Sequence, residues 1–250
     1  MTTPARITYL KPAFFNRDPR RVARALLGKL LIRKTPGGMV AGRIVETEAY
    51  LGQGDAAAHA AAGRTPRNAV LFGPPGHAYV YFIYGSHYCL NVSCLPEGVP
   101  GCVLFRALEP VEGIELMATA RGIDLERQQV EGSCGDGRLA RPAERSSANA
   151  GSHDNPGFGR VKQSTLKKIS SGPGRLTEAL GITRLRDNGK SLVSPRSDLR
   201  IADDTHRVGR VTVTPRIGIA KSVDQPLRYF IAGNPFVSGR SPAAQKPLPV

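Results

Sequence analysis

The chain lacks tryptophan, has only four cysteines among 250 residues, and contains no apolar run long enough to cross a membrane as a helix. The cysteines, at positions 89, 94, 102 and 134, form no C-x-x-C pair. Their spacing therefore argues against a zinc ribbon and against a secreted disulfide framework. We expect reduced thiols, no metal site and no cofactor. Because no signal-peptide-like segment begins the chain, we expect an intracellular protein, cytoplasmic or nucleoid-associated if bacterial.

Acidic residues are also scarce, with 20 Asp and Glu against 35 Lys and Arg, a net charge of +15 and a pI near 10.2. Such an excess favours a polyanionic partner, with nucleic acid first, although a basic protein that is merely soluble remains the alternative. At 40% hydrophobic residues the chain can bury a core without a disulfide or metal. We expect one domain over residues 1–250, acting as a monomer.

The pattern of caps, turns and apolar runs predicts short helices alternating with strands, an α+β fold. From Asp124 to Ser164 the chain is rich in Gly, Ser and Arg, which predicts a basic flexible insertion. Residues 239–250, and more broadly the chain after Phe236, are expected to form a loose tail. The expected helices are 18–28, 55–62, 111–121 and 171–181, with a shorter turn at 66–72; the expected strands are 29–33, 39–47, 102–107, 199–202, 208–219 and 227–232.

An aromatic hairpin is predicted over residues 79–91, where tyrosines alternate in an apolar run. A three-residue loop Tyr84-Gly85-Ser86 pairs Ile83 with His87 and places Tyr81 and Asn91 on one face. A tyrosine at the tip of a turn is exposed, and in a basic chain the flat partner that it suits is a nucleic-acid base.

A carboxylate near aromatic rings and a histidine is the minimum set for hydrolysing the bond between a sugar and a base. Glu48, Tyr50, His59 and Tyr81 supply that set. Residue pattern alone leaves another interpretation open, in which Glu48 forms a salt bridge with an arginine and the tyrosines are half-buried sheet residues.

Ordered blocks over nearly the whole chain resemble the alkyladenine (3-methyladenine) DNA glycosylase family, the mammalian-type methylpurine DNA glycosylases. The matching blocks are residues 43–52, Ala58-His59, Arg64-Thr65-Pro66-Arg67-Asn68, residues 79–85, residues 104–110, residues 171–176, Arg216-Ile217-Gly218-Ile219, residues 226–230 and residues 234–238. The resemblance implies a single domain with a curved, largely antiparallel sheet, short peripheral helices and a protruding DNA-intercalating hairpin. It also implies a base excision repair enzyme that flips alkylated or deaminated purines from double-stranded DNA and leaves an abasic site.

The resemblance assigns the catalytic roles. Glu48 is the general base that activates water, and Arg106 together with the backbone carbonyl of Ile217 holds that water. Glu46 becomes a structural partner. No lysine is found in the matched pocket blocks, so we expect hydrolysis without a lyase step.

The same resemblance assigns the base-binding roles. Tyr50, His59 and Tyr81 sandwich the extruded base, Asn91 crowds the exocyclic amino group of guanine, and Tyr84 intercalates through the minor groove. His87 departs from the apolar residues that family members can carry there, and we expect a plain exposed histidine.

Two rival interpretations remain. Gly172-Pro173-Gly174 opening a helix is similar to the hairpin-helix-hairpin loop, which binds DNA phosphate. Alternatively, the chain is a non-catalytic module that binds damaged DNA or nucleic acid in general, for which Glu48 would be unnecessary.

Overall fold

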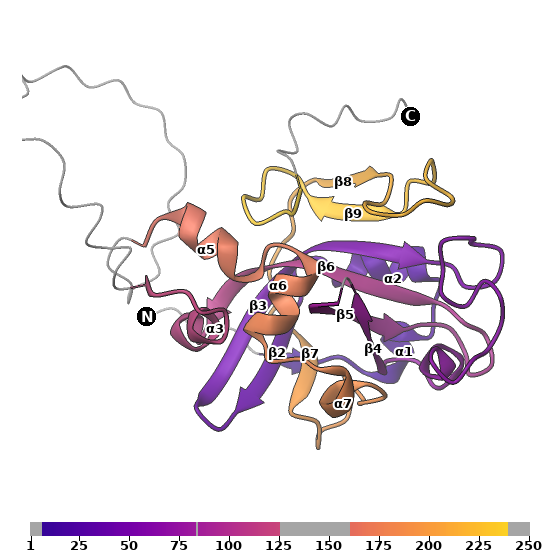
Figure 1. The fold of residues 1–250 in the computed structure, drawn as a ribbon, viewed down its shortest axis with the longest axis horizontal. Helices are drawn as coiled ribbons and strands as arrows, with labels where there is room; N and C mark the ends of the chain where they lie inside the picture. The colour runs from indigo at the N-terminus through magenta and orange to yellow at the C-terminus, as the bar shows by residue number, and fades with distance from the viewer. Residues whose placement is uncertain (1–6, 84, 126–160, 240–250) are drawn as a thin grey trace, which may run out of the picture.

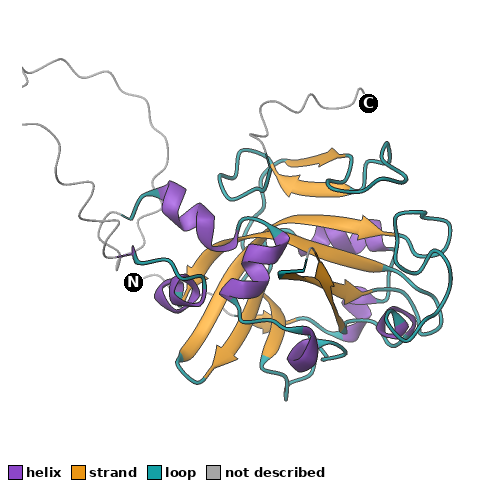
Figure 2. Ribbon diagram, in the orientation of Figure 1, coloured by secondary structure: helices purple, strands orange, loops and turns teal. Residues whose placement is uncertain are grey.

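The computed structural model describes residues 7–83, 85–125 and 161–239. The strands are β1 (Thr8–Tyr9), β2 (Leu30–Thr35), β3 (Gly38–Tyr50), β4 (Ala78–Ile83), β5 (His87–Ser93), β6 (Cys102–Glu112), β7 (Leu199–Asp203), β8 (Val211–Thr214) and β9 (Arg228–Ile231). The helices are α1 (Pro12–Phe15), α2 (Pro19–Leu26), the 3₁₀ helix η1 (Ala69–Phe72), α3 (Ile114–Ala120), α5 (Gln163–Ser170), α6 (Pro173–Ala179) and α7 (Arg184–Asp187). The fold is a mixed α+β domain of strands with short helices around them, as predicted (Figures 1 and 2).

One open sheet organises the described residues, in the order β1-β7-β2-β3-β6-β5-β4, and every pairing in it is antiparallel. Strand β3 is its long central member. Its first half pairs with β2, and after a bulge around Glu46 its second half pairs with β9 on the same edge. Strand β6 pairs with the other edge from Ala41 to Tyr50. The pairing with β9 brings the late β8–β9 segment against the carboxylates of β3 (Figure 1).

The hairpin of β4 and β5 has the predicted register. Ile83 pairs with His87, so the connection is three residues long, and Tyr79 pairs with Asn91. Side chains of Tyr79, Tyr81 and Asn91 consequently project to one face. Tyr84 lies outside the described residues.

Helix α2 begins where the sequence predicts it. Asp18 accepts the backbone N–H of Arg20, and Pro19 occupies the first turn. Val22 and Leu26 are buried, and α2 packs against β3. Helix α6, which follows Gly172, packs on β5 and β6. The two helices help to hold the central strands that carry the polar cluster described below.

Three predicted elements differ from the structure. Residues 55–62 form successive turns rather than a helix, and the Asp55 carboxylate is held there by Arg216 and by the N–H groups of Leu51 and Ala57. Strand β6 runs on through Pro110 to Glu112, which delays the next helix to Ile114. The strand expected over 208–219 is limited to β8.

The ends of the predicted insertion and tail also differ. Gln163 and Ser164 form the first turn of α5, while residues 126–160 lie outside the described ranges. Val237 and Ser238 are buried, and the N–H of Ser238 donates to Glu46, so the chain is ordered beyond Phe236. No helix in the described ranges is long and apolar enough to span a membrane.

Candidate active site

A fully buried carboxylate, Glu48, lies near the end of β3. Its Oε1 accepts the backbone N–H of Ile217 at 2.8 Å and lies 3.2 Å from the Arg106 guanidinium. Its Oε2 accepts the hydroxyl of Tyr50 at 3.0 Å. A carboxylate has about four lone-pair sites, so these three contacts leave capacity for one more donor, such as water.

Burial raises the pKa of Glu48, whereas the positive charge of Arg106 and the hydrogen bonds from Ile217 and Tyr50 act to lower it. The net shift is upward. A carboxylate with a raised pKa is a stronger base once ionised. Glu48 therefore has the environment of a proton acceptor rather than that of a simple surface salt bridge.

Glu46, two residues earlier, uses its carboxylate in structural contacts. Its carboxylate accepts Nε of Arg106 at 2.9 Å, Nε of Arg228 at 2.6 Å and the N–H of Ser238 at 2.6 Å. Arg106, which lies on β6, therefore bridges the carboxylates of Glu46 and Glu48. This arrangement agrees with the structural role that the family resemblance implies for Glu46, and it fixes the guanidinium beside Glu48.

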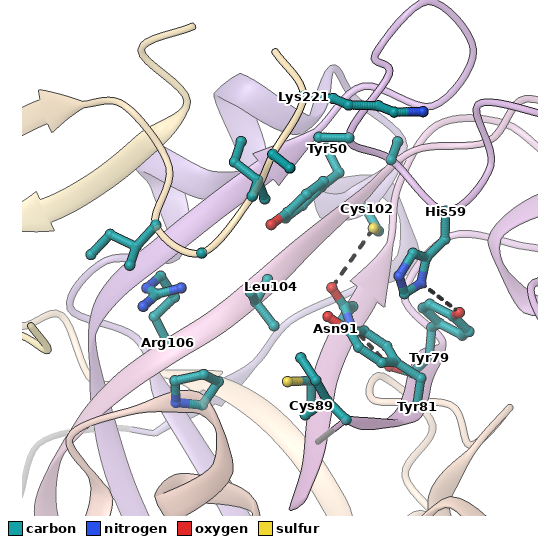
Figure 3. Close-up of a pocket in the computed structure, with 18 of the residues that line it drawn as sticks. Tyr50, His59, Tyr79, Tyr81, Cys89, Asn91, Cys102, Leu104, Arg106 and Lys221 are labelled. Atoms are coloured by element: carbon teal, nitrogen blue, oxygen red, sulfur yellow. Dashed lines mark hydrogen bonds between the residues drawn. The ribbon is translucent and has the colours of Figure 1, made fainter. Parts of the chain in front are cut away.

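A cavity of about 600 Å³ lies beside this cluster (Figure 3). Tyr50, Arg106 and Ile217, the three partners of Glu48, all line it. Tyr50 lies on one side, and His59 and Tyr81 lie on the other. The volume is within the range of pockets that take up small organic molecules. The cavity is thus bounded by aromatic rings, with the carboxylate just beneath its wall.

His59 is held by a residue that the sequence analysis did not single out. The Nδ1 of His59 lies 2.9 Å from the hydroxyl of Tyr79, and the rings of His59 and Tyr81 meet edge to face at 4.5 Å. Burial and the charge of Arg67 lower the pKa of His59, so its ring is neutral at neutral pH. The alternation of tyrosines along β4 is the signal that could have indicated Tyr79.

Asn91 lines the same cavity with its amide orientation set by two contacts. Its Nδ2 donates to the carbonyl of Tyr79 at 3.2 Å, and Cys102 Sγ donates to its Oδ1 at 3.8 Å (Figure 3). Both residues are buried. Burial raises the pKa of the Cys102 thiol to about 12, so the thiol keeps the proton that it donates.

The structure brings together seven of the eight predicted site residues: Glu48, Arg106, Ile217, Tyr50, His59, Tyr81 and Asn91. Tyr84, the eighth, lies outside the described residues. Ile217 meets Glu48 through its N–H. Within the described ranges, no group of three or more His, Cys, Asp or Glu could hold a metal ion.

Two sequence expectations need correction here. Lys221 lines the cavity, so a lysine does lie at the site, and no sequence pattern had pointed to it (Figure 3). His87 is exposed, as expected, but it has a partner, because its Nδ1 lies 2.6 Å from the Glu178 carboxylate on α6. That contact joins the turn end of the hairpin to the helix.

A buried carboxylate, a guanidinium beside it and an aromatic cavity in a strongly basic chain fit one class of protein, a hydrolase that acts on nucleic acid. Comparison with known proteins agrees. The sequence profile of the Methylpurine-DNA glycosylase (MPG) family matches residues 13–235. The chain belongs to this family and is a monofunctional DNA glycosylase, a hydrolase of N-glycosyl bonds.

Similar proteins from several organisms share nearly the full length. A protein of Koribacter versatilis is 55% identical over 236 residues, covering 94% of this chain and 96% of that protein. A protein of Prosthecochloris aestuarii is 40% identical, covering 92% of this chain and 90% of its own. One of Methanocella arvoryzae is 38% identical, covering 92% and 95% respectively. Each carries the name "Putative 3-methyladenine DNA glycosylase".

Proposed function

We propose that the cavity takes up a purine flipped out of double-stranded DNA, alkylated or deaminated, and that Glu48 activates the water that releases it. The observation that carries this proposal is the contact of Glu48 with three residues that line an aromatic cavity. The names of the relatives suggest 3-methyladenine as one such purine. All the described site residues come from one chain, so a monomer is sufficient.

The chemistry requires one proton acceptor. Glu48 accepts a proton from water, the water oxygen forms a bond to C1′ of the sugar, and the bond from C1′ to the base nitrogen breaks with its electron pair going to the base. An N-alkylated purine is cationic and becomes neutral as it leaves, so it needs no protonation by a general acid. Arg106, with the backbone of Ile217, positions the carboxylate and the water.

Selection of a damaged base follows from charge and from pairing. Aromatic faces attract a cationic base by about 0.5–2 kcal/mol per contact. The neutral state of His59 avoids a repulsive charge beside such a base. Damage that weakens pairing also lowers the cost of extrusion, which is a few kcal/mol for a normal base.

The role proposed for Tyr84 rests on the family resemblance. It stands in the three-residue connection between β4 and β5, and β4 also carries two aromatic walls of the cavity, Tyr79 and Tyr81. An aromatic ring inserted where a base has left recovers stacking in the duplex. We therefore assign it the intercalating role.

Substitution of Glu48 by Gln tests the function. A glycosylase loses base release by several orders of magnitude and still binds DNA containing the lesion, because the amide keeps the shape of the carboxylate but cannot accept the proton. Glu115→Gln, an exposed glutamate on α3, is the matched control. A non-catalytic binding module would show no base release in the wild-type protein, and undiminished release by the Glu48→Gln variant would remove Glu48 from its role.

A further inference from the structure

A buried ion pair lies directly behind one wall of the cavity. Arg216 donates to both carboxylate oxygens of Asp55, at 2.6 and 2.8 Å, and both side chains are fully buried. The guanidinium carbon lies 4.6 Å from the centre of the Tyr50 ring. Among the described residues that line the cavity, Tyr50 is present and Arg216 is not. The ring therefore separates the cation from a bound base.

The pair connects three segments that form the walls. Asp55 also accepts the backbone N–H groups of Leu51, after β3, and Ala57, in the turn before His59. Arg216 donates to the carbonyl of Ala49 and immediately precedes Ile217. One carboxylate and one guanidinium thus set the relative positions of Tyr50, the turn that carries His59 and the N–H that binds Glu48.

The charges of the pair bear on the Tyr50 ring. A cation over one face of an aromatic ring withdraws electron density from the other face, where a cationic base would bind. Asp55 compensates that cation at hydrogen-bond distance. Burial acts to raise the pKa of Asp55, but the hydrogen bonds from Arg216 and from the backbone lower it overall, so the carboxylate is ionised at neutral pH.

We propose that Asp55 and Arg216 form a charge-compensated positioning pair that sets the preference of the cavity between cationic and neutral purines. The inference rests on the proposed function, since it needs a purine in the cavity. Neither residue contacts that purine. Their effect is transmitted through Tyr50, whose back face Arg216 covers, and through the turn that Asp55 holds.

Asp55→Asn is the direct test. Because a guanidinium does not lose its proton in proteins, the variant leaves an uncompensated positive charge behind Tyr50. Single-turnover release of 3-methyladenine, which is cationic in DNA, is compared with release of a neutral purine, hypoxanthine or ethenoadenine. The ratio of the two rates is expected to fall on the order of tenfold. A merely structural role lowers both rates together and leaves their ratio unchanged.

Controls separate charge from folding. Asp187→Asn breaks another fully buried pair, with Arg33, neither member of which lines the cavity, and should leave the ratio unchanged. The double variant Asp55→Asn with Arg216→Met removes both charges and should restore the ratio toward the wild-type value. If Asp55→Asn does not fold, Arg216→Met serves instead. In that variant the carboxylate of Asp55 is uncompensated, so the ratio of cationic to neutral purine release should rise above that of the double variant.

Failure of this inference is distinct from failure of the proposed function. Wild-type protein that releases no damaged purine contradicts the proposed function. Wild-type protein that releases both purines, with a ratio unchanged in every folded single variant, overturns the role of the Asp55–Arg216 pair alone.

Discussion

The hydroxyl of Tyr50 donates a hydrogen bond of 3.0 Å to Oε2 of Glu48. Burial and the neighbouring carboxylate raise the pKa of the Tyr50 phenol, so it remains a donor throughout the physiological range. One residue thus forms an aromatic wall of the cavity and stabilises the ionised form of the proposed base. Tyr50 thereby links base binding to proton transfer.

The pH dependence of base release should depend on that bond. Glu48 must be ionised to act, and its pKa is raised, so activity should fall with decreasing pH from a point above the ordinary glutamate value of 4.5. Tyr50→Phe removes a contribution that lowers this pKa and should move the acid limb to higher pH. Single-turnover rates between about pH 5 and about pH 9 test this. Tyr79→Phe, which loses a bond to His59 instead, should leave the acid limb in place.

Asn91 should control the discrimination between guanine-type and adenine-type lesions. The family resemblance gives it the role of crowding the amino group of guanine, and its amide is held in place by Tyr79 and Cys102. Asn91→Ala should raise release of 7-methylguanine relative to 3-methyladenine by about tenfold. The relative rates can be measured by chromatography of bases released from methylated DNA. An equal loss for both bases would show that Asn91 only supports the fold.

Lys221 should bind DNA without forming a covalent bond to it. Its exposed side chain lines the cavity and lies above Tyr50 in Figure 3, where its charge can meet a DNA phosphate. Lys221→Ala should weaken binding and reduce the slope of log affinity against log salt by about 1. Lys34→Ala, an exposed lysine beside the β2–β3 turn, is the control.

Borohydride reduction provides the complementary measurement on Lys221. A monofunctional glycosylase forms no Schiff base, so no protein should become covalently attached to abasic DNA. A trapped complex that disappears in Lys221→Ala would instead identify this lysine as a nucleophile.

Tyr84→Ala should affect duplex DNA more than single strands. Loss of a stacked ring costs about 1–3 kcal/mol where a base has been extruded, a cost that applies only if a gap in the duplex is being filled. Rates of base release from the same lesion in duplex and single-stranded DNA provide the comparison. A similar loss on both substrates would contradict intercalation.

Asp187 should contribute to stability and not to catalysis. It forms a fully buried ion pair with Arg33 at 2.8 Å and a second ion pair, at 2.9 Å, with the partly exposed Lys190. Asp187→Asn should destabilise the fold by about 3 kcal/mol. This value is near the low end for a broken buried ion pair, because Arg33 retains its ion pair with Asp198. Thermal melting measures this, with the exposed Asp224→Asn as the control.

The same substitution has a predictable pH dependence. Although burial acts to raise the pKa of Asp187, hydrogen bonds from Lys190 and Arg33 lower it overall in the folded state. Its stabilisation is therefore present above the unfolded pKa and is lost as the pH falls through the folded value. The difference in melting temperature between wild type and variant should shrink under acidic conditions. A constant difference would contradict this linkage.

Local patterns were sufficient for the hairpin and for α2. Period-two alternation and the length of the turn specified the pairing of Ile83 with His87, and a cap, a proline and a glycine delimited the helix around residues 19–26. They failed at residues 55–62, where alanine propensity favoured a helix. There a carboxylate contact with Arg216, 161 residues away, outweighed a weak local preference.

Residue types and their order along this chain were enough to indicate an α+β protein, a polyanionic partner for its basic surface, and a carboxylate with aromatic rings for binding a nucleobase. Only the folded chain could show that Glu46 is used for structure while Glu48 faces three residues of the cavity wall, that Lys221 reaches the cavity, and that Arg216 lies behind Tyr50. The physical reason is distance along the chain. A side chain's charge state and role depend on burial and on partners that the β3 bulge and the β8–β9 pairing bring from far positions, and no local pattern encodes them.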